Sequence, residues 1–117
     1  MKKTIFLDID GTLLRHCGSL TNIFFEDSPQ VLDGAIEKIN EWESKGYNII
    51  LTTGRKESLR RITENQLVKL GIVYDQLIMG LGGGPRYIIN DLKPNSEEPT
   101  AQAINLKRNG GIGNVKI

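Results

Sequence analysis

Short apolar runs alternate with stretches of helical periodicity along this chain. The apolar runs predict strands at residues 4–9, 47–53, within 74–79 and at 86–90. Between them, recurring apolar positions predict helices at residues 30–45 and 56–70. Regular alternation of strands and helices is typical of an α/β domain with a mainly parallel central sheet.

The predicted helix ends carry the usual capping residues. Ser28 is a candidate N-cap of the first helix, with Pro29 at the first helical position. Gly46 and Gly71 stand where the two helices end, at the position that favours glycine. The sequence therefore predicts both helices with defined ends.

The C-terminal part has a weaker pattern. Residues 101–107 fit a helix capped by Thr100, but Ile104 and Leu106 alternate with polar residues, which favours a strand. Three glycines at residues 110, 111 and 113 indicate a loose tail.

Composition narrows the function classes. A chain of 117 residues is the size of one domain, so residues 1–117 are expected to form a single one. A lone cysteine, Cys17, excludes an intrachain disulfide and a multi-cysteine zinc site. The net charge of +1 excludes the strongly basic surface of a general nucleic-acid binder. No apolar run reaches the ~18 residues of a membrane span, and Asp8 interrupts the only signal-like run, so we expect a cytoplasmic protein.

Two aspartates follow the first predicted strand. Residues i and i+2 of a strand face the same way, roughly 7 Å apart, so Asp8 and Asp10 should project together. Ligands of open parallel sheets bind at the carboxyl ends of the strands. Two close carboxylates repel each other, and a bound cation, best Mg²⁺ for oxygen ligands, would neutralise them. The alternative is two solvated aspartates in an ordinary turn.

Two further strands end in polar residues. Thr53, with Thr52 as the fallback, precedes Gly54-Arg55, and a hydroxyl with free backbone N–H groups at such a turn can hold a phosphate oxygen. Asn90-Asp91 ends the fourth predicted strand. Taken alone, the threonine is an ordinary strand former or cap, and Asp91 an ordinary cap.

The string Asp-Ile-Asp-Gly-Thr after an apolar strand, followed by the other two motifs, resembles the haloacid-dehalogenase-like (HAD) superfamily. It is most similar to the small cap-less type of the capsule-biosynthesis phosphatases. The resemblance implies a three-layer Rossmann-like fold without a cap domain and Mg²⁺-dependent phosphomonoester hydrolysis through an aspartyl-phosphate. The implied residue roles are a nucleophile at Asp8, a general acid/base at Asp10, metal ligation by Asp8, Asp10, Asp91 and Asn90, and phosphate binding by Thr53, Gly54, Gly11 and Thr12.

One family feature is missing. No lysine lies between the third predicted strand and Asp91 to neutralise the nucleophile and the phosphate. Lys93 and Arg55 lie on loops at the correct end of the sheet and are the expected phosphate-binding substitutes. Arg86 begins a predicted strand and is expected at the opposite end, roughly 13 Å from Asn90. Backbone N–H groups of the glycine-rich loop at residues 80–84 are a further alternative.

The short connections predict an open site. Such a site admits a large phosphorylated substrate or is covered by a second copy of the chain. Phe24-Phe25 would then contact that partner or form a wall for the substrate, and the default alternative is that they anchor the loop to the core. By analogy, the resemblance suggests a sugar phosphate or surface-polysaccharide precursor. The alternative is a binding or regulatory protein on the same scaffold, consistent with the missing lysine. A signalling receiver domain ranks low, because the third predicted strand ends without an aspartate.

Overall fold

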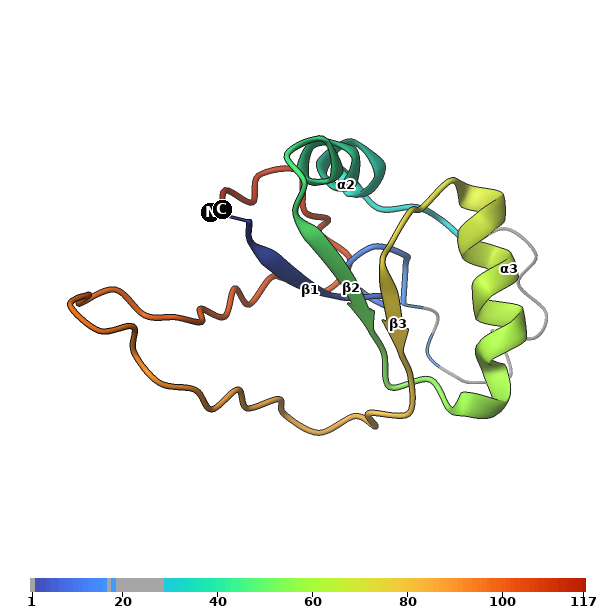
Figure 1. The fold of residues 1–117 in the computed structure, drawn as a ribbon. Coiled ribbons are helices and arrows are strands. Elements are labelled where there is room, and N and C mark those ends of the chain that lie inside the picture. Colours follow the sequence, from blue (N-terminus) through green and yellow to red (C-terminus); the bar gives the residue numbers. More distant parts are fainter. Residues whose placement is uncertain (1, 17, 19–28) are drawn as a thin grey trace.

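A computed structural model describes residues 2–16, 18 and 29–117. Three parallel strands in the order β1-β2-β3 form the sheet (Figure 1). In chain order the elements are β1 (Thr4–Asp8), α2 (Ala35–Ser44), β2 (Asn48–Thr52), the 3₁₀-helix η1 (Glu57–Leu59), α3 (Arg60–Leu70) and β3 (Gln76–Ile78). The predicted α/β class, the parallel sheet and the first three strands are confirmed.

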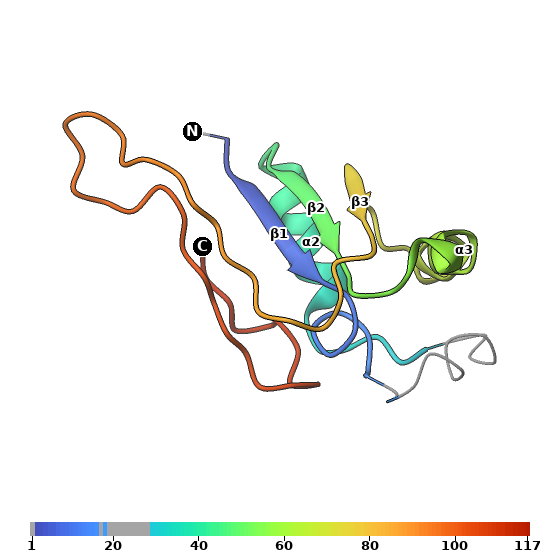
Figure 2. The same cartoon turned by 90° about the horizontal axis from the view of Figure 1, so that it is seen from below.

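The two faces of the sheet differ. One face carries alternate apolar side chains that join the buried residues of both helices in one core; its members include Ile5, Leu7, Ile49, Leu51 and Leu77 from the sheet, Ala35, Ile39 and Trp42 from α2, and Leu67 from α3. Figure 2 shows α2 lying behind the sheet. On the other face Phe6 is 53% exposed and Ile78 38% exposed. The described helices therefore cover one face, and β1 forms an open edge.

Helix α2 begins five residues later than predicted. Val31 pairs with Leu14, and the Leu32 N–H donates to the Leu13 carbonyl at 2.8 Å, so this stretch is extended. The N-cap is Gly34, and Ser28 lies outside the described residues. The apolar spacing therefore continues into a segment whose backbone pairs with the loop after β1. The predicted ends at Gly46 and Gly71 are confirmed, since the N–H groups of both donate to the last turn of the preceding helix.

Residues 86–90 are extended but form no strand, contrary to expectation. Tyr87 is 87% exposed and Ile89 94% exposed, and the stretch belongs to a long loop that runs out past the sheet (Figure 1). Residues 101–107, on the returning arm, form neither helix nor strand. Apolar and β-branched residues favour extended backbone, but a strand also requires a neighbour with which to exchange hydrogen bonds.

The C-terminal segment is not the loose tail that its glycines indicated. Ile112 is 1% exposed and belongs to the core, and its N–H donates to the Asp33 carbonyl at 2.8 Å. Here the absence of side chains serves close packing: the backbone of Gly113 lies directly against Gly34. These glycines therefore allow the C-terminal segment to pack closely against the start of α2.

Substituting Gly34 by Ala should separate the C-terminal segment from α2. Gly34 has φ +77°, and its new β-carbon would collide with the backbone of Gly113. Gly46 has φ +76° with nothing within 4 Å of an added β-carbon, so Gly46→Ala isolates the backbone strain. We expect a loss of about 1–2 kcal/mol for Gly46→Ala and about 2–4 kcal/mol for Gly34→Ala in urea unfolding. Equal losses would show that the close approach contributes nothing.

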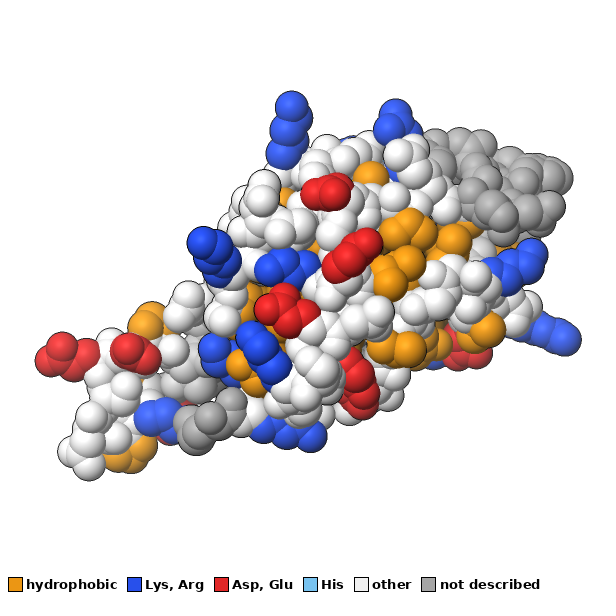
Figure 3. Space-filling model, turned by 90° about the horizontal axis from the view of Figure 1, so that it is seen from above, with side chains coloured by type: hydrophobic (Ala, Val, Ile, Leu, Met, Phe, Trp, Pro, Cys, Tyr) orange, Lys and Arg blue, Asp and Glu red, His pale blue; other side chains and the backbone are white. Residues whose placement is uncertain are grey.

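The surface on the α2 side mixes both signs of charge. Lysines and arginines are interspersed with aspartates and glutamates (Figure 3), in keeping with the net charge of +1. Among the described residues, no helix has both the length and the apolar character that crossing a bilayer would require.

Candidate active site

The two aspartates of the first motif line one open pocket at the carboxyl end of β1. A tight turn follows the strand: the N–H groups of Leu13 and Leu14 both donate to the Ile9 carbonyl, at 2.9 and 3.0 Å. Gly11 occupies this turn with φ +92°, which favours glycine. The pocket has a volume of about 150 Å³ and is lined by Asp8, Asp10, Gly11, Thr12, Leu106 and Arg108. The predicted convergence of both aspartates is therefore found.

Opposing influences act on the Asp8 carboxyl. Desolvation by the surrounding protein raises its pKa above the ordinary value, and the neighbouring Asp10 charge raises it further. Hydrogen bonds from the Ile9 backbone and the Thr12 side chain, and the positive charge of Arg86, act in the opposite direction. The net pKa is raised, so the ionised form gains from any additional cation that enters the pocket.

Asp10 is held by a buried arginine. Arg55, 4% exposed, donates from Nε and from one terminal nitrogen to the two Asp10 oxygens, each at 2.8 Å. Its other terminal nitrogen donates to Thr63 Oγ1 at 3.0 Å and Gln66 Oε1 at 2.9 Å. Four of the five guanidinium N–H groups are thus engaged within the protein. The structure places Arg55 as a support for Asp10, and the predicted phosphate contact has at most one free donor.

The second motif does not line the pocket. Thr53 is 1% exposed, and its hydroxyl accepts a hydrogen bond from the Arg55 backbone N–H at 3.0 Å. An added β-carbon on Gly54 would lie 2.6 Å from the Gly82 carbonyl oxygen, so this turn is closely packed. This is the capping role considered as the alternative, and phosphate binding by Thr53 and Gly54 stays a prediction.

The glycine-rich loop is tied to the same turn. The N–H of Gly80 donates to the Arg55 carbonyl at 2.7 Å and that of Leu81 to the Thr53 carbonyl at 3.1 Å. These two N–H groups are therefore not available to an anion. The contacts also fix where the chain leaves β3, next to the carboxyl ends of the strands.

The third motif does not reach the pocket. In the part of the chain that the structure describes, no group of three or more His, Cys, Asp or Glu side chains is placed to share a metal ion. Asn90, Asp91 and Lys93 are exposed on the long loop, where the Asp91 carbonyl accepts a hydrogen bond from the Thr100 hydroxyl at 2.6 Å. Without pairing of residues 86–90, nothing returns Asp91 to the end of the sheet.

The same path reverses the expectation for Arg86. We expected this residue at the far end of the sheet, yet its charge acts on Asp8. Directly after β3 the chain crosses the carboxyl ends of the strands before the long loop runs outward (Figure 2), which agrees with the effect of the Arg86 charge on Asp8.

Sequence reasoning missed several site residues. Leu106 lies within the weakly patterned stretch at residues 101–107 and Arg108 directly follows it, and no local signal connects them with the first motif. Thr63 and Gln66 did carry a signal, since both fall on the apolar helical spacing shared by Leu59 and Leu67. Buried polar residues on such a face require partners, and Arg55 is that partner.

Comparisons with known proteins agree with this arrangement. A family model described as the LNS2 domain of PITM 1-3 matches residues 5–82. A D-glycero-beta-D-manno-heptose-1,7-bisphosphate 7-phosphatase of Pasteurella multocida is 38% identical over 71 residues, covering 60% of this chain and 37% of the relative. A probable enzyme of the same kind from Thermoplasma acidophilum is 30% identical over 82 residues, covering 60% of this chain and 49% of the relative. The chain thus spans less than half the length of these relatives.

Solved structures share the fold. A chain of the Pnkp1/Rnl/Hen1 complex superposes with a TM-score of 0.60 at 30% identity, covering 74% of this chain and 30% of that one. A structural-genomics target from Vibrio cholerae gives a TM-score of 0.54 at 21% identity, covering 75% of this chain and 79% of that one. With two aspartates converging at the end of β1 and a family match over well over half of its length, this chain belongs to the LNS2-domain family, a branch of the HAD-like superfamily.

Proposed function

We propose that this chain is a Mg²⁺-dependent phosphomonoester hydrolase that forms an aspartyl-phosphate on Asp8. The observation that carries the proposal is the shared pocket of Asp8 and Asp10, in which Asp10 is fixed by Arg55 while Asp8 accepts hydrogen bonds from Ile9 and Thr12 of its own turn. One carboxylate is thereby oriented for proton transfer, and the other faces the open pocket as a nucleophile.

The donor set of the pocket fits Mg²⁺. This ion is usually bound by one or two carboxylates and keeps several waters, to which substrate phosphate oxygens are added. The Asp8 carboxylate lines the pocket, and no described residue donates a hydrogen bond to the Asp10 backbone carbonyl, so both oxygens can serve. Bound there, the ion would offset the negative charge of the reacting phosphoryl group. Ligation by Asp91 and Asn90 stays a prediction that requires the long loop to move.

The chemistry of the two aspartates is a double displacement. An Asp8 oxygen attacks phosphorus and forms the acyl-phosphate bond, while the bond from phosphorus to the ester oxygen breaks. Asp10 gives a proton to the departing oxygen and then takes one from the water that attacks phosphorus. This second step releases inorganic phosphate and restores the Asp8 carboxylate. A carboxylate has about four acceptor positions, and the Arg55 fork takes two, so Asp10 can exchange a proton while remaining oriented.

We infer that the substrate is a sugar phosphate. Support comes from the relatives named as heptose-bisphosphate phosphatases, whose similarity includes part of this chain only. The pocket opens directly to solvent, which suits a substrate whose sugar part extends outside it. It stays a prediction that a second copy of the chain covers the site. The cytoplasmic location likewise stays a prediction.

Magnesium-dependent release of phosphate tests this function. We expect the chain to hydrolyse p-nitrophenyl phosphate and a heptose or hexose bisphosphate in the presence of Mg²⁺, with phosphate measured colorimetrically. Removal of the ion with EDTA should abolish turnover, and added Mg²⁺ should restore it. Turnover that is unchanged in EDTA would contradict the metal dependence.

A binding or regulatory protein is the second candidate. The observation in its favour is that, among the described residues, neither Asp91 nor a lysine lines the pocket that holds Asp8. Measurable affinity for inorganic phosphate without hydrolysis of any ester in the panel would favour this candidate over the phosphatase.

A further inference from the structure

Among the described residues, the motifs identified from the sequence contribute no cationic side chain to the lining of the candidate active site. A phosphoryl group beside Asp8 and Asp10 adds further negative charge next to two carboxylates, and a cationic side chain in contact with it would share with Mg²⁺ the task of offsetting that charge. Arg55 is poorly suited to this role, because four of its five donors are engaged within the protein and its side chain is buried. Arg86 acts on Asp8 only through its charge and does not line the pocket.

Arg108 does line the pocket. It is exposed, and its side chain lies over Gly11: a β-carbon added there would be 3.3 Å from Arg108 Cγ and 3.9 Å from Nε. Among the described residues, no acceptor lies within hydrogen-bonding or ion-pair distance of its guanidinium. Two carboxylates repel an anion unless a cation lies beside them. The planar guanidinium of Arg108 has free donors at this place and is therefore suited to binding a phosphate.

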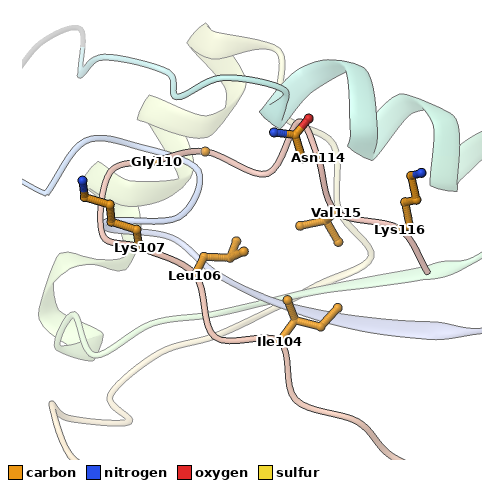
Figure 4. A pocket seen from close by; sticks show the side chains of 8 residues that line it. Ile104, Leu106, Lys107, Gly110, Asn114, Val115 and Lys116 are labelled. Carbon is orange, nitrogen blue, oxygen red and sulfur yellow. The ribbon is translucent and has the colours of Figure 1, made fainter.

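The backbone beside Arg108 is fastened to the first motif. The Asn109 N–H donates to the Gly11 carbonyl at 2.8 Å, and the Asn109 side-chain oxygen accepts from the His16 N–H at 2.8 Å. Asn109 has φ +64°, a left-handed conformation that turns the chain sharply at this point. Figure 4 shows this part of the C-terminal segment, with Leu106 and Gly110 beside the loop that follows β1.

Burial further along the chain holds this turn in place. Ile112, three residues after Asn109, belongs to the core and is 1% exposed. Arg108 therefore extends from an anchored turn, although the arm before it is exposed. A fixed backbone reduces the entropy lost when the side chain binds an anion.

We propose that Arg108, from the C-terminal segment, binds the phosphoryl group of the substrate above Asp8 and so takes the place of the missing lysine. This inference rests on the proposed function and assigns the residue that neutralises the reacting group. It also gives the C-terminal segment a functional reason to dock on the loop after β1.

Charge removal at Arg108 tests the proposal in the full chain. With p-nitrophenyl phosphate, we expect Arg108→Gln to lower kcat/KM by about 10- to 100-fold, with a fall in kcat as well as a rise in KM. Arg108→Lys keeps the charge but not the fork and should recover part of the loss. The matched control is Arg61→Gln, which removes the same charge from the exposed surface of α3 and should leave both constants within about twofold.

Inorganic phosphate provides a readout that does not require turnover. Calorimetric titration should show phosphate binding weakened about tenfold or more by Arg108→Gln and unchanged by Arg61→Gln. If the wild type is active or binds phosphate, and Arg108→Gln behaves like Arg61→Gln, the inference about Arg108 is overturned while the proposed function stands. If the wild type neither hydrolyses the ester nor binds phosphate, both are overturned. A wild type that binds phosphate through Arg108 without turnover supports Arg108 and contradicts the hydrolase.

Discussion

Replacing Asp8 by Asn is expected to reduce phosphatase turnover by about 10³-fold or more. The amide is nearly the same size as the carboxylate but is not a nucleophile towards phosphorus, so the acyl-phosphate cannot form. Asp10, Arg55 and the turn around Gly11 keep their contacts in this variant, because none of them depends on the Asp8 charge. Steady-state kinetics with p-nitrophenyl phosphate and Mg²⁺ measure the effect, and near-normal turnover would falsify the mechanism.

The stability of the same variant separates loss of chemistry from loss of fold. Folding raises the pKa of Asp8 through desolvation, so the stability associated with its protonated form is lost as the pH rises through the folded-state pKa. Asn carries no charge, and Asp8→Asn should therefore be at least as stable as the wild type at pH 7. The two melting temperatures should converge below the ordinary pKa of aspartate. Because the side chain is exposed to the pocket, the gain is small.

Replacing Arg55 by Ala is expected to destabilise the protein by about 3–5 kcal/mol. The variant leaves the Asp10 carboxylate without its bidentate partner and removes the donors to Thr63 and Gln66, both of which are buried. It also opens a cavity between α3 and the loop after β2. Urea unfolding monitored by circular dichroism measures the change in the free energy of unfolding.

Two variants show whether the loss comes from this network. Arg61→Ala removes an exposed arginine of α3 and should leave the free energy of unfolding nearly unchanged. Arg55→Lys keeps the charge without the fork and should fall between Arg55→Ala and the wild type. A loss of less than about 1 kcal/mol in Arg55→Ala would mean that the buried ion pair only compensates for its own desolvation.

The first motif could be predicted from the sequence because its geometry is local. Asp8 is the last residue of β1 and Asp10 follows two residues later, so the strand end and the turn directly after it bring both side chains to one pocket. The apolar runs of β1, β2 and β3 likewise determine both the strands and their buried faces. The helix ends at Gly46 and Gly71 follow from backbone preferences of single residues.

The third motif could not be predicted, because its position depends on a pairing between distant segments. Residues 86–90 have the composition of a strand, but no partner pairs with them among the described residues, so Asp91 lies far along a loop and the charge of Arg86 acts on Asp8. The late start of α2 has a similar cause, since Leu32 bonds to the loop after β1 and not to the following helical turn.

By itself, the sequence determined the α/β class, the parallel strands β1 to β3 and the paired aspartates, because each depends on periodicity and on neighbours within a few residues. Only the tertiary structure decided which arginine side chains lie beside the two aspartates. It buried Arg55 against Asp10, Thr63 and Gln66, and it brought Arg108 over Gly11 through the docked C-terminal segment. These contacts join residues that are far apart in the chain. Their free energy comes from burial and hydrogen bonding between distant segments, which cannot be predicted from a local sequence pattern.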